Sequence, residues 1–260
     1  MRRIALGVEY DGTQFAGWQI QKEQRTVQGC LTKAISRVAN QAIKTVAAGR
    51  TDSGVHALQQ VVHFDTDAIR EPHNWILGLN TNLPSDMNVV WAKTVDETFS
   101  ARFSAVKRAY RYIILNRVSR SSVNASRMWW YFQKLDIERM QAAADCLVGH
   151  HDFSAFRAKD CQAKSPFKTM ESITVSKQGD CIAIDVIGQS FLHHMVRNIV
   201  GVLVPIGEGK RPVSWASEVL EGTDRAHGGI TSPPEGLYFV KVDYPAHYGL
   251  PTVSTFPVVW

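Results

Sequence analysis

Apolar and polar residues alternate at the start of the chain in the way a strand requires. From Arg2 to Tyr10, apolar side chains occupy every second position, as expected for a strand with one buried face. Thr26 then precedes an apolar stripe at helical spacing, and its hydroxyl suits a helix N-cap. Apolar segments at 43–48 and 59–64 predict two further strands around a polar loop of residues 49–57.

Similar patterns continue through the rest of the chain. They predict helices beginning at Pro72, over 136–146, over 193–206 and over 215–220. They predict strands over 87–95, 105–115, 172–176, 181–187 and 237–242, with a hairpin turn at 178–180. We therefore expect an α+β protein with an N-terminal domain over 1–102 and a C-terminal domain over 103–260. The tail from about residue 245 reads as irregular.

Composition narrows the class of protein. The 260 residues are 45% hydrophobic and 20% charged, which favours a globular fold over a disordered chain. The chain contains no apolar run of about 18 residues, so we expect no membrane helix. Glu9 interrupts the N-terminal apolar stretch too early for a signal peptide. The four cysteines are scattered, which suits neither a zinc site nor a disulfide scaffold, so we expect a cytoplasmic protein.

Basic residues concentrate in one segment of the chain. Residues 99–127 include seven Lys or Arg and no acid, although the net charge of the whole chain is only +5. Such a concentration indicates a surface for a polyanion. The alternative is a solvated strand face whose long side chains lie over the core.

The loop of residues 49–57, GRTDSGVHA, carries the most distinctive chemistry. Two glycines bracket Asp52, because Gly adopts backbone angles that other residues avoid. Arg50 lies two residues before Asp52, where a guanidinium would keep the carboxylate ionised. Such a carboxylate is a candidate nucleophile. The alternative is that Asp52 and Ser53 only form turn hydrogen bonds.

The tripeptide Asp52-Ser53-Gly54 also resembles the signature of aspartic proteases. Those enzymes need two carboxylates that share a proton, from two motif copies or a small dimer. This chain has one copy, is too long for the dimeric kind, and places an arginine where it would oppose the shared proton. We reject that class.

The whole nonapeptide closely resembles the catalytic motif of the TruA family of tRNA pseudouridine synthases. Further resemblance extends along nearly the entire chain, in five ordered blocks: VEYDGTQFAGWQ at 8–19, FSARF at 99–103, RAYRY at 108–112, FLHHMVRN at 191–198 and EGLY at 235–238. The resemblance implies a pseudouridine synthase fold, with two similar α+β lobes that share a continuous, mostly antiparallel sheet and a central catalytic cleft.

The resemblance also implies roles for three residues. Asp52 would be the nucleophile, attacking either C6 of a flipped-out uracil or C1′ of its ribose. Tyr110 would stack on the base and could relay the C5 proton, while Tyr112 on the same strand face would belong to the core. Arg197 would pair with the catalytic aspartate and keep it charged.

Other matching positions would contact the substrate. Arg50 and Leu237 would line the site of the flipped base. The RNA contacts would come from Arg70, Phe99, Ser100, Ala101, Arg102, Phe103, Arg108, Arg111 and the loop 159–166. Ala109 departs from the family pattern, in which a further arginine is more common, and this weakens one phosphate contact at most.

We expect no metal and no cofactor. The pairs His193-His194 and His150-His151 suggest a metal site, but adjacent histidines on a helix point about 100° apart and chelate poorly. The expected partners are tRNA, through its anticodon stem-loop at positions 38–40, and a second copy of the chain. The other hypotheses are an RNA-binding protein without catalysis and a synthase that modifies another RNA.

Overall fold

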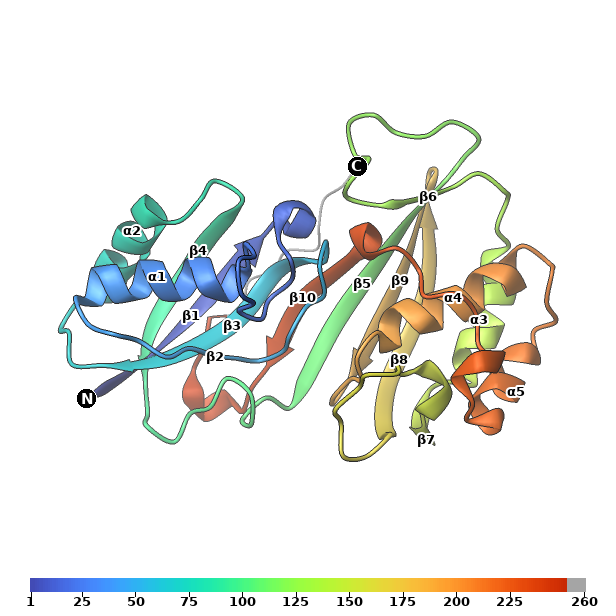
Figure 1. Cartoon of the computed structure of the whole chain (residues 1–260). Helices are drawn as coiled ribbons and strands as arrows, with labels where there is room; N and C mark the ends of the chain where they lie inside the picture. The colour runs from blue at the N-terminus through green and yellow to red at the C-terminus, as the bar shows by residue number, and fades with distance from the viewer. Residues whose placement is uncertain (252–260) are drawn as a thin grey trace. The chain divides into compact units, whose positions relative to one another are not determined.

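The computed structural model describes residues 1–251 and divides the chain into two compact units (Figure 1). Unit 1 comprises Met1–Val106 and the segment from Tyr238, and unit 2 comprises Lys107–Leu237. Each unit combines strands with helices, so the α+β class predicted from the sequence is confirmed.

Unit 1 is built on a sheet whose middle strand is the first of the chain. Its strands are β1 (Arg2–Tyr10), β2 (Val46–Ala47), β3 (His56–Thr66), β4 (Met87–Val95) and β10 (Leu237–Asp243). β1 lies between β4 and β3 and is antiparallel to both, while β10 runs parallel to β3 through the pair Tyr238 and His56. β1 buries five consecutive residues, so both of its faces are covered instead of the single face that alternation predicted.

The helices α1 (Val27–Ala39) and α2 (Pro72–Asn82) belong to unit 1. The Thr26 hydroxyl accepts a hydrogen bond from the Gly29 amide, which confirms the predicted N-cap of α1. α2 begins at Pro72 as predicted, because proline suits the first turn of a helix. Short 3₁₀ turns occur at η1 (Gly12–Gln14) and η5 (Ala246–Tyr248).

The strands of unit 2 follow the order β5-β9-β8-β7, with β6 beside β5. The strands are β5 (Lys107–Asn116), β6 (Trp129–Tyr131), β7 (Gly149–Asp152), β8 (Phe167–Gln178) and β9 (Cys181–Gly188). The hairpin of β8 and β9 turns at Gly179, whose φ of 56° is the left-handed conformation that glycine accepts readily.

The helices of unit 2 are α3 (Ile137–Asp145), α4 (Met195–Gly207) and α5 (Trp215–Gly222), with 3₁₀ turns η2 (Ser154–Phe156), η3 (Arg225–His227) and η4 (Pro234–Gly236). The Asp136 carboxylate caps α3 by accepting from the amides of Glu138 and Arg139. α4 is almost entirely buried.

The last strand returns the chain to unit 1, whereas the sequence placed everything after residue 102 in one C-terminal domain. β10 pairs with β3, and the Asp243 carbonyl accepts from the Val106 amide. Residues 252–260 of the predicted irregular tail lie outside the described residues. Within residues 1–251, no helix is long and apolar enough to cross a bilayer.

Candidate active site

The loop that carries Asp52 lies between β2 and β3 in unit 1, as predicted. Its backbone turns back on itself, because the Val55 amide donates to the Asp52 carbonyl at 3.2 Å. Gly54 sits at the turn with a φ of +78°, so the second glycine of the motif is required by conformation. Asp52 is half-buried, while Thr51 before it is buried. The backbone around the carboxylate is therefore fixed, with the acid at the edge of the packed unit.

The segment of residues 11–18 supports this loop from behind. The Trp18 amide donates to the Thr51 carbonyl at 2.9 Å, and the Ser53 hydroxyl donates to the Phe15 carbonyl at 3.1 Å. Phe15 and Trp18 are themselves buried against Tyr10. Hydrogen bonds on both sides of Asp52 thus tie the loop to the segment that follows β1.

Two glycines allow this support to come close. A Cβ atom on Gly12 would lie 2.0 Å from the Val55 carbonyl oxygen, and one on Gly17 would lie 2.9 Å from the Thr51 carbonyl oxygen. Gly17 also has a φ of +84°. Both obstacles are backbone atoms of the Asp52 loop, so they cannot rotate away. Direct backbone packing explains why both positions need glycine.

Buried polar side chains complete the support. The Tyr10 hydroxyl and the Thr51 hydroxyl are 2.8 Å apart, and the Gln60 amide both donates to the Gly49 carbonyl at 2.7 Å and accepts from its amide at 3.3 Å. Gln60 is fully buried. Burial raises the pKa of Tyr10 to about 12, so its hydroxyl stays protonated at neutral pH.

His56, at the end of the motif, joins the loop to the first strand and to the last. The Gly12 amide donates to its Nδ1 at 3.1 Å, and the ring stacks on Tyr238 of β10 with centroids 4.7 Å apart. Oδ1 of the Asp11 carboxylate lies 3.2 Å from the same nitrogen. His56 is thus a structural part of the loop's support.

The expected pairing of Arg50 with Asp52 is wrong. Arg50 is exposed and forms no ion pair with any residue in the range 1–251. A flexible side chain in water gains little from holding one carboxylate, which explains the outward position of Arg50.

Arg70 donates from Nε and Nη2 to the Val38 carbonyl at 3.1 and 2.7 Å, and so caps the C-terminal end of α1.

The other predicted catalytic residues belong to unit 2. Tyr110 is 9% exposed and meets Phe191 edge-on, with centroids 4.8 Å apart. Tyr112 is fully buried and donates its hydroxyl to the Pro233 carbonyl at 2.7 Å, which confirms its predicted place in the core. Both tyrosines are thus buried in unit 2, and the role of Tyr110 at the base stays a prediction.

Arg197 lies in the first turn of α4, where Ser232 holds it at two points. The Arg197 Nε donates to the Ser232 carbonyl at 2.7 Å, and the Ser232 amide donates to the Arg197 carbonyl at 3.2 Å.

α4 begins at Met195, and His194 precedes it with a φ of +62°. The predicted helix began at residue 193, two residues too early. His193 and His194 therefore lie outside the helix, and the argument that adjacent helical histidines chelate a metal poorly does not apply to them. His150 and His151 lie in β7.

The basic residues of β5 are engaged within unit 2. Arg111 donates to both oxygens of Asp185 at 2.7 and 2.8 Å, across the β5 and β9 pair. Arg108 donates to the Gln189 carbonyl at 2.6 Å. The bidentate pair already engages the Arg111 guanidinium, and its expected RNA contact stays a prediction. Leu237 is buried at the start of β10.

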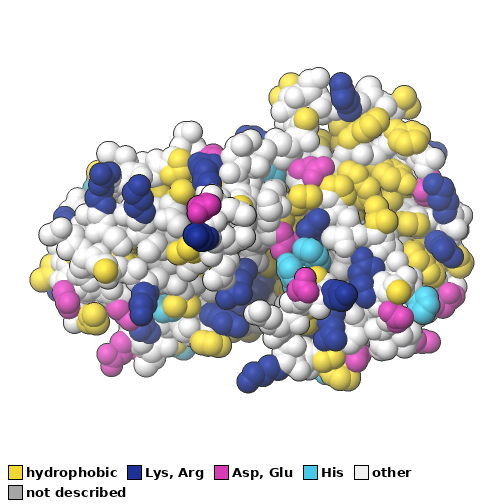
Figure 2. Space-filling view, viewed as in Figure 1, with side chains coloured by type: hydrophobic (Ala, Val, Ile, Leu, Met, Phe, Trp, Pro, Cys, Tyr) yellow, Lys and Arg dark blue, Asp and Glu magenta, His cyan; other side chains and the backbone are white. Residues whose placement is uncertain are grey.

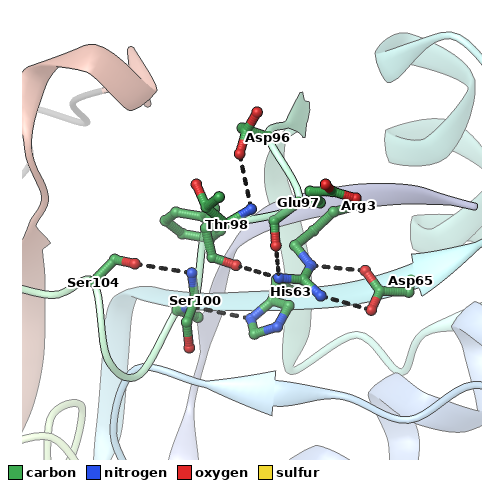
Figure 3. A network of polar contacts seen from close by, with 10 residues as sticks. Arg3, His63, Asp65, Asp96, Glu97, Thr98, Ser100 and Ser104 are labelled. Atoms are coloured by element: carbon green, nitrogen blue, oxygen red, sulfur yellow. Dashed lines mark hydrogen bonds and ion pairs between the residues drawn. The ribbon is translucent and has the colours of Figure 1, made fainter.

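The turn of residues 99–104 is tightly held (Figure 3). Arg3 donates to the carbonyls of Phe99 and Glu97 and to the Asp65 carboxylate, and the Ala101 amide donates to His63 Nδ1 at 3.0 Å. Phe99 and Ala101 are fully buried, so their side chains belong to the core of unit 1, and RNA contacts by these residues stay a prediction. Ser100 is half-buried, whereas Arg102 and Phe103 are exposed.

His63 predicts a pH dependence of stability. Burial lowers its pKa to about 4, with Arg3 adding to the effect and Asp65 opposing it. The unfolded ring titrates near 6.5, so between these values the unfolded state binds a proton that the folded state does not. We expect the free energy of unfolding to fall as the pH is lowered through this window, by at most about 1.4 kcal/mol per pH unit.

Urea unfolding between pH 7 and pH 5 measures this effect. His63→Asn, which keeps an acceptor but does not titrate, should show a flatter dependence. Equal slopes in the two proteins would contradict the assignment.

Several supporting residues were not predicted from the sequence. The sequence shows Gly12 and Gly17 as two glycines in a loop with aromatic residues. Their contact with the Asp52 loop joins residues far apart in the sequence, so the local pattern could not predict it. A stronger signal was available for Gln60 and His63, since polar residues among the apolar residues of a strand usually have buried partners. Arg3 carried no comparable signal.

Comparison with known proteins places this site in a family. A family model described as tRNA pseudouridine synthase matches residues 7–104 and 143–245. The tRNA pseudouridine synthase A of Nitrosococcus oceani is 55% identical over 99% of this chain and 100% of its own. Those of Alcanivorax borkumensis and Methylococcus capsulatus are 52% and 48% identical, over 99% and 98% of this chain and 97% and 94% of their own. The matched residues include Asp52 in unit 1 and Arg197 in unit 2.

Proposed function

Since this chain belongs to the tRNA pseudouridine synthase family, we propose that it isomerises uridines of the tRNA anticodon stem-loop with Asp52 as its nucleophile. The enzyme is an isomerase that converts uridine in tRNA to pseudouridine. The resemblance of its motifs to the TruA family supports positions 38–40 of the tRNA as targets.

The reaction sets the requirements for the site. The bond between uracil N1 and ribose C1′ breaks, the base turns, a bond forms between C5 and C1′, and the C5 proton leaves to solvent. A stacked base must first leave the RNA helix. A carboxylate that attacks C6 or C1′ can hold the base or the sugar through this exchange. The isomerisation has no net redox change, so the proposal includes no cofactor.

The fixed backbone around Asp52 is the observation that carries the proposal. Hydrogen bonds from Trp18 and Ser53, with the buried Tyr10 and Gln60, hold the loop on both sides of the acid. A nucleophile must be held close to its reactive geometry, because misplacement by about 1 Å can cost a factor of about 100 in rate. A simple surface turn does not need such support.

Family resemblance supports the remaining roles. Arg197 is proposed to keep Asp52 ionised, Tyr110 to stack on the flipped base, and Leu237 to pack against it. Exposed Arg50 is proposed to contact RNA near the base. The clamp of Arg197 by Ser232 is consistent with a fixed guanidinium in such a role.

Exposed basic residues are proposed to bind the tRNA backbone. Each phosphate contact releases counterions, so tRNA affinity should fall steeply as the salt concentration rises. Arg102→Ala should reduce the slope of log affinity against log salt by about 1. Filter retention of labelled tRNA at several salt concentrations measures the slope.

Lys177→Ala, at an exposed position of β8, is the matched control and should leave the slope unchanged. A slope that Arg102→Ala does not change would place the phosphate contact elsewhere.

A second copy of the chain is the proposed protein partner, and the cytoplasm is the proposed compartment. Large apolar side chains are exposed around β6 in unit 2, namely Val118, Val123, Trp130 and Phe132. Figure 2 shows hydrophobic side chains gathered where Figure 1 labels β6. An exposed apolar cluster favours association with another protein surface, and a second copy of this chain is the simplest partner.

Position mapping tests the proposed target. Whole tRNA with uridine only at 38, 39 or 40 should be converted, and the same tRNA with cytidine at those three positions should not. Conversion elsewhere in the tRNA would favour a different target. Tight binding to tRNA without conversion would favour the RNA-binding hypothesis.

A further inference from the structure

The turn of residues 99–104 presents two side chains to solvent while hydrogen bonds fix its backbone. Phe103 is 81% exposed, and the Arg102 guanidinium lies over its ring at 5.2 Å from the centroid. An exposed Phe gains nothing from burial within unit 1. A planar ring beside a guanidinium is a surface on which an unpaired nucleobase can stack.

The backbone of the turn has its hydrogen-bonding groups satisfied from inside unit 1. The Phe99 carbonyl accepts from Arg3 at 2.8 Å, and the Ala101 carbonyl accepts from the Tyr244 hydroxyl at 2.6 Å. Within the turn, Ser100 and Ser104 bond each other twice, at 2.9 Å each. The turn is therefore a preformed element whose conformation depends on a few side chains.

His63 is central to this arrangement. It lies in β3, is 6% exposed and packs edge-on against Phe99, with centroids 5.9 Å apart. Its Nδ1 accepts from the Ala101 amide, the residue before the exposed pair. A neutral ring is required for this bond, and burial beside Arg3 keeps it neutral. Figure 3 shows His63 beside Arg3 and next to Ser100 of the turn.

We infer that His63 is a positioning residue for tRNA binding: through the Ala101 amide it fixes the turn that presents Phe103 as a stacking surface for an unpaired base of the tRNA. The inference rests on the proposed function, because it needs tRNA as the ligand. The predicted defect lies in binding and leaves the chemical step intact, which separates this role from that of the Asp52 loop.

The experiment compares His63→Leu, His63→Asn, Phe103→Ala and the double variant His63→Leu/Phe103→Ala. Phe103→Ala should raise the Kd for tRNA about tenfold, in the range measured for loss of one stacked base. His63→Leu should raise it by a similar factor, and His63→Asn, whose amide oxygen can replace Nδ1, should restore most of the affinity. kcat at saturating tRNA should stay within about twofold of wild type in every variant, since chemistry is untouched.

The double variant gives the decisive result. If His63 acts through Phe103, the Kd of the double variant for tRNA should be no higher than that of the single variant that binds tRNA less tightly. Three results would overturn the inference. The Kd of the double variant could rise by the product of the two single-variant factors, the Kd of His63→Leu could stay unchanged, or kcat could fall while Kd stays unchanged. If His63→Leu does not fold, Ser104→Ala removes the bond to the Ser100 amide from a half-buried position, and the same expectations and contrary results apply to it.

Leu77→Ala is the matched control, because Leu77 is also a large exposed apolar residue of unit 1, at 55%. It should leave the Kd unchanged. Wild-type protein that neither binds nor converts tRNA would refute the proposed function. Wild-type activity with an unchanged Kd in Phe103→Ala would refute this inference alone.

Discussion

Gly12→Ala is expected to lower kcat by about a hundredfold and to destabilise the protein by about 2–3 kcal/mol. The new Cβ atom would lie 2.0 Å from the Val55 carbonyl oxygen and 2.5 Å from its carbon. Neither atom can rotate away, so the support segment or the Asp52 loop must move. Movement also weakens the bond from the Gly12 amide to His56. Steady-state conversion of tRNA and thermal unfolding measure the two effects.

Gly222→Ala is the control for this prediction. A Cβ atom there would meet nothing within 4 Å, and the residue ends α5. The variant should keep wild-type kcat and stability within about 0.5 kcal/mol. If Gly12→Ala behaved like this control, the close packing of the support segment would not position Asp52.

Asp52→Asn is expected to reduce tRNA conversion by roughly four orders of magnitude or more, as loss of a nucleophile does in other enzymes. Asn keeps the shape of the side chain and favours the same turns, so the loop should stay folded. The affinity for tRNA should stay within about tenfold of wild type, or roughly 1.4 kcal/mol. The three quantities to measure on one preparation are turnover, tRNA retention and melting temperature.

Asp67→Asn, an exposed carboxylate at 72% side-chain exposure, is the matched control and should change none of the three. Wild-type turnover in Asp52→Asn would show that Asp52 only braces its turn. Normal folding and tRNA binding with lost turnover would establish that its charge is needed for the reaction.

Local signals predicted much of the fold. β1 and β4 have the predicted bounds, and Thr26 caps its helix as predicted, because strand alternation and N-caps are properties of a few neighbouring residues. The short β6 and β7 were not predicted. β6 contains three residues and exists through its parallel pairing with β5, a long-range contact that the local pattern does not encode.

Part of the candidate site was equally visible. The sequence identified Asp52 and the need for glycine in its loop, and the structure places that loop between two strands. Burial was less predictable. Phe99 and Ala101 share a motif with exposed Arg102 and Phe103, and only the packing of the turn on β3 decides which side chains face inward. The ion pair of Arg111 with Asp185 depends on the register of β5 and β9.

Single-turnover release of tritium from C5-labelled uridine in whole tRNA, with enzyme in excess, tests the central claim most directly. Release reports departure of the C5 proton, which the isomerisation requires and binding alone does not cause. Wild-type protein should release one tritium for each uridine converted at positions 38–40, and Asp52→Asn should release none above background. Release by Asp52→Asn at a rate within about tenfold of wild type would contradict the account.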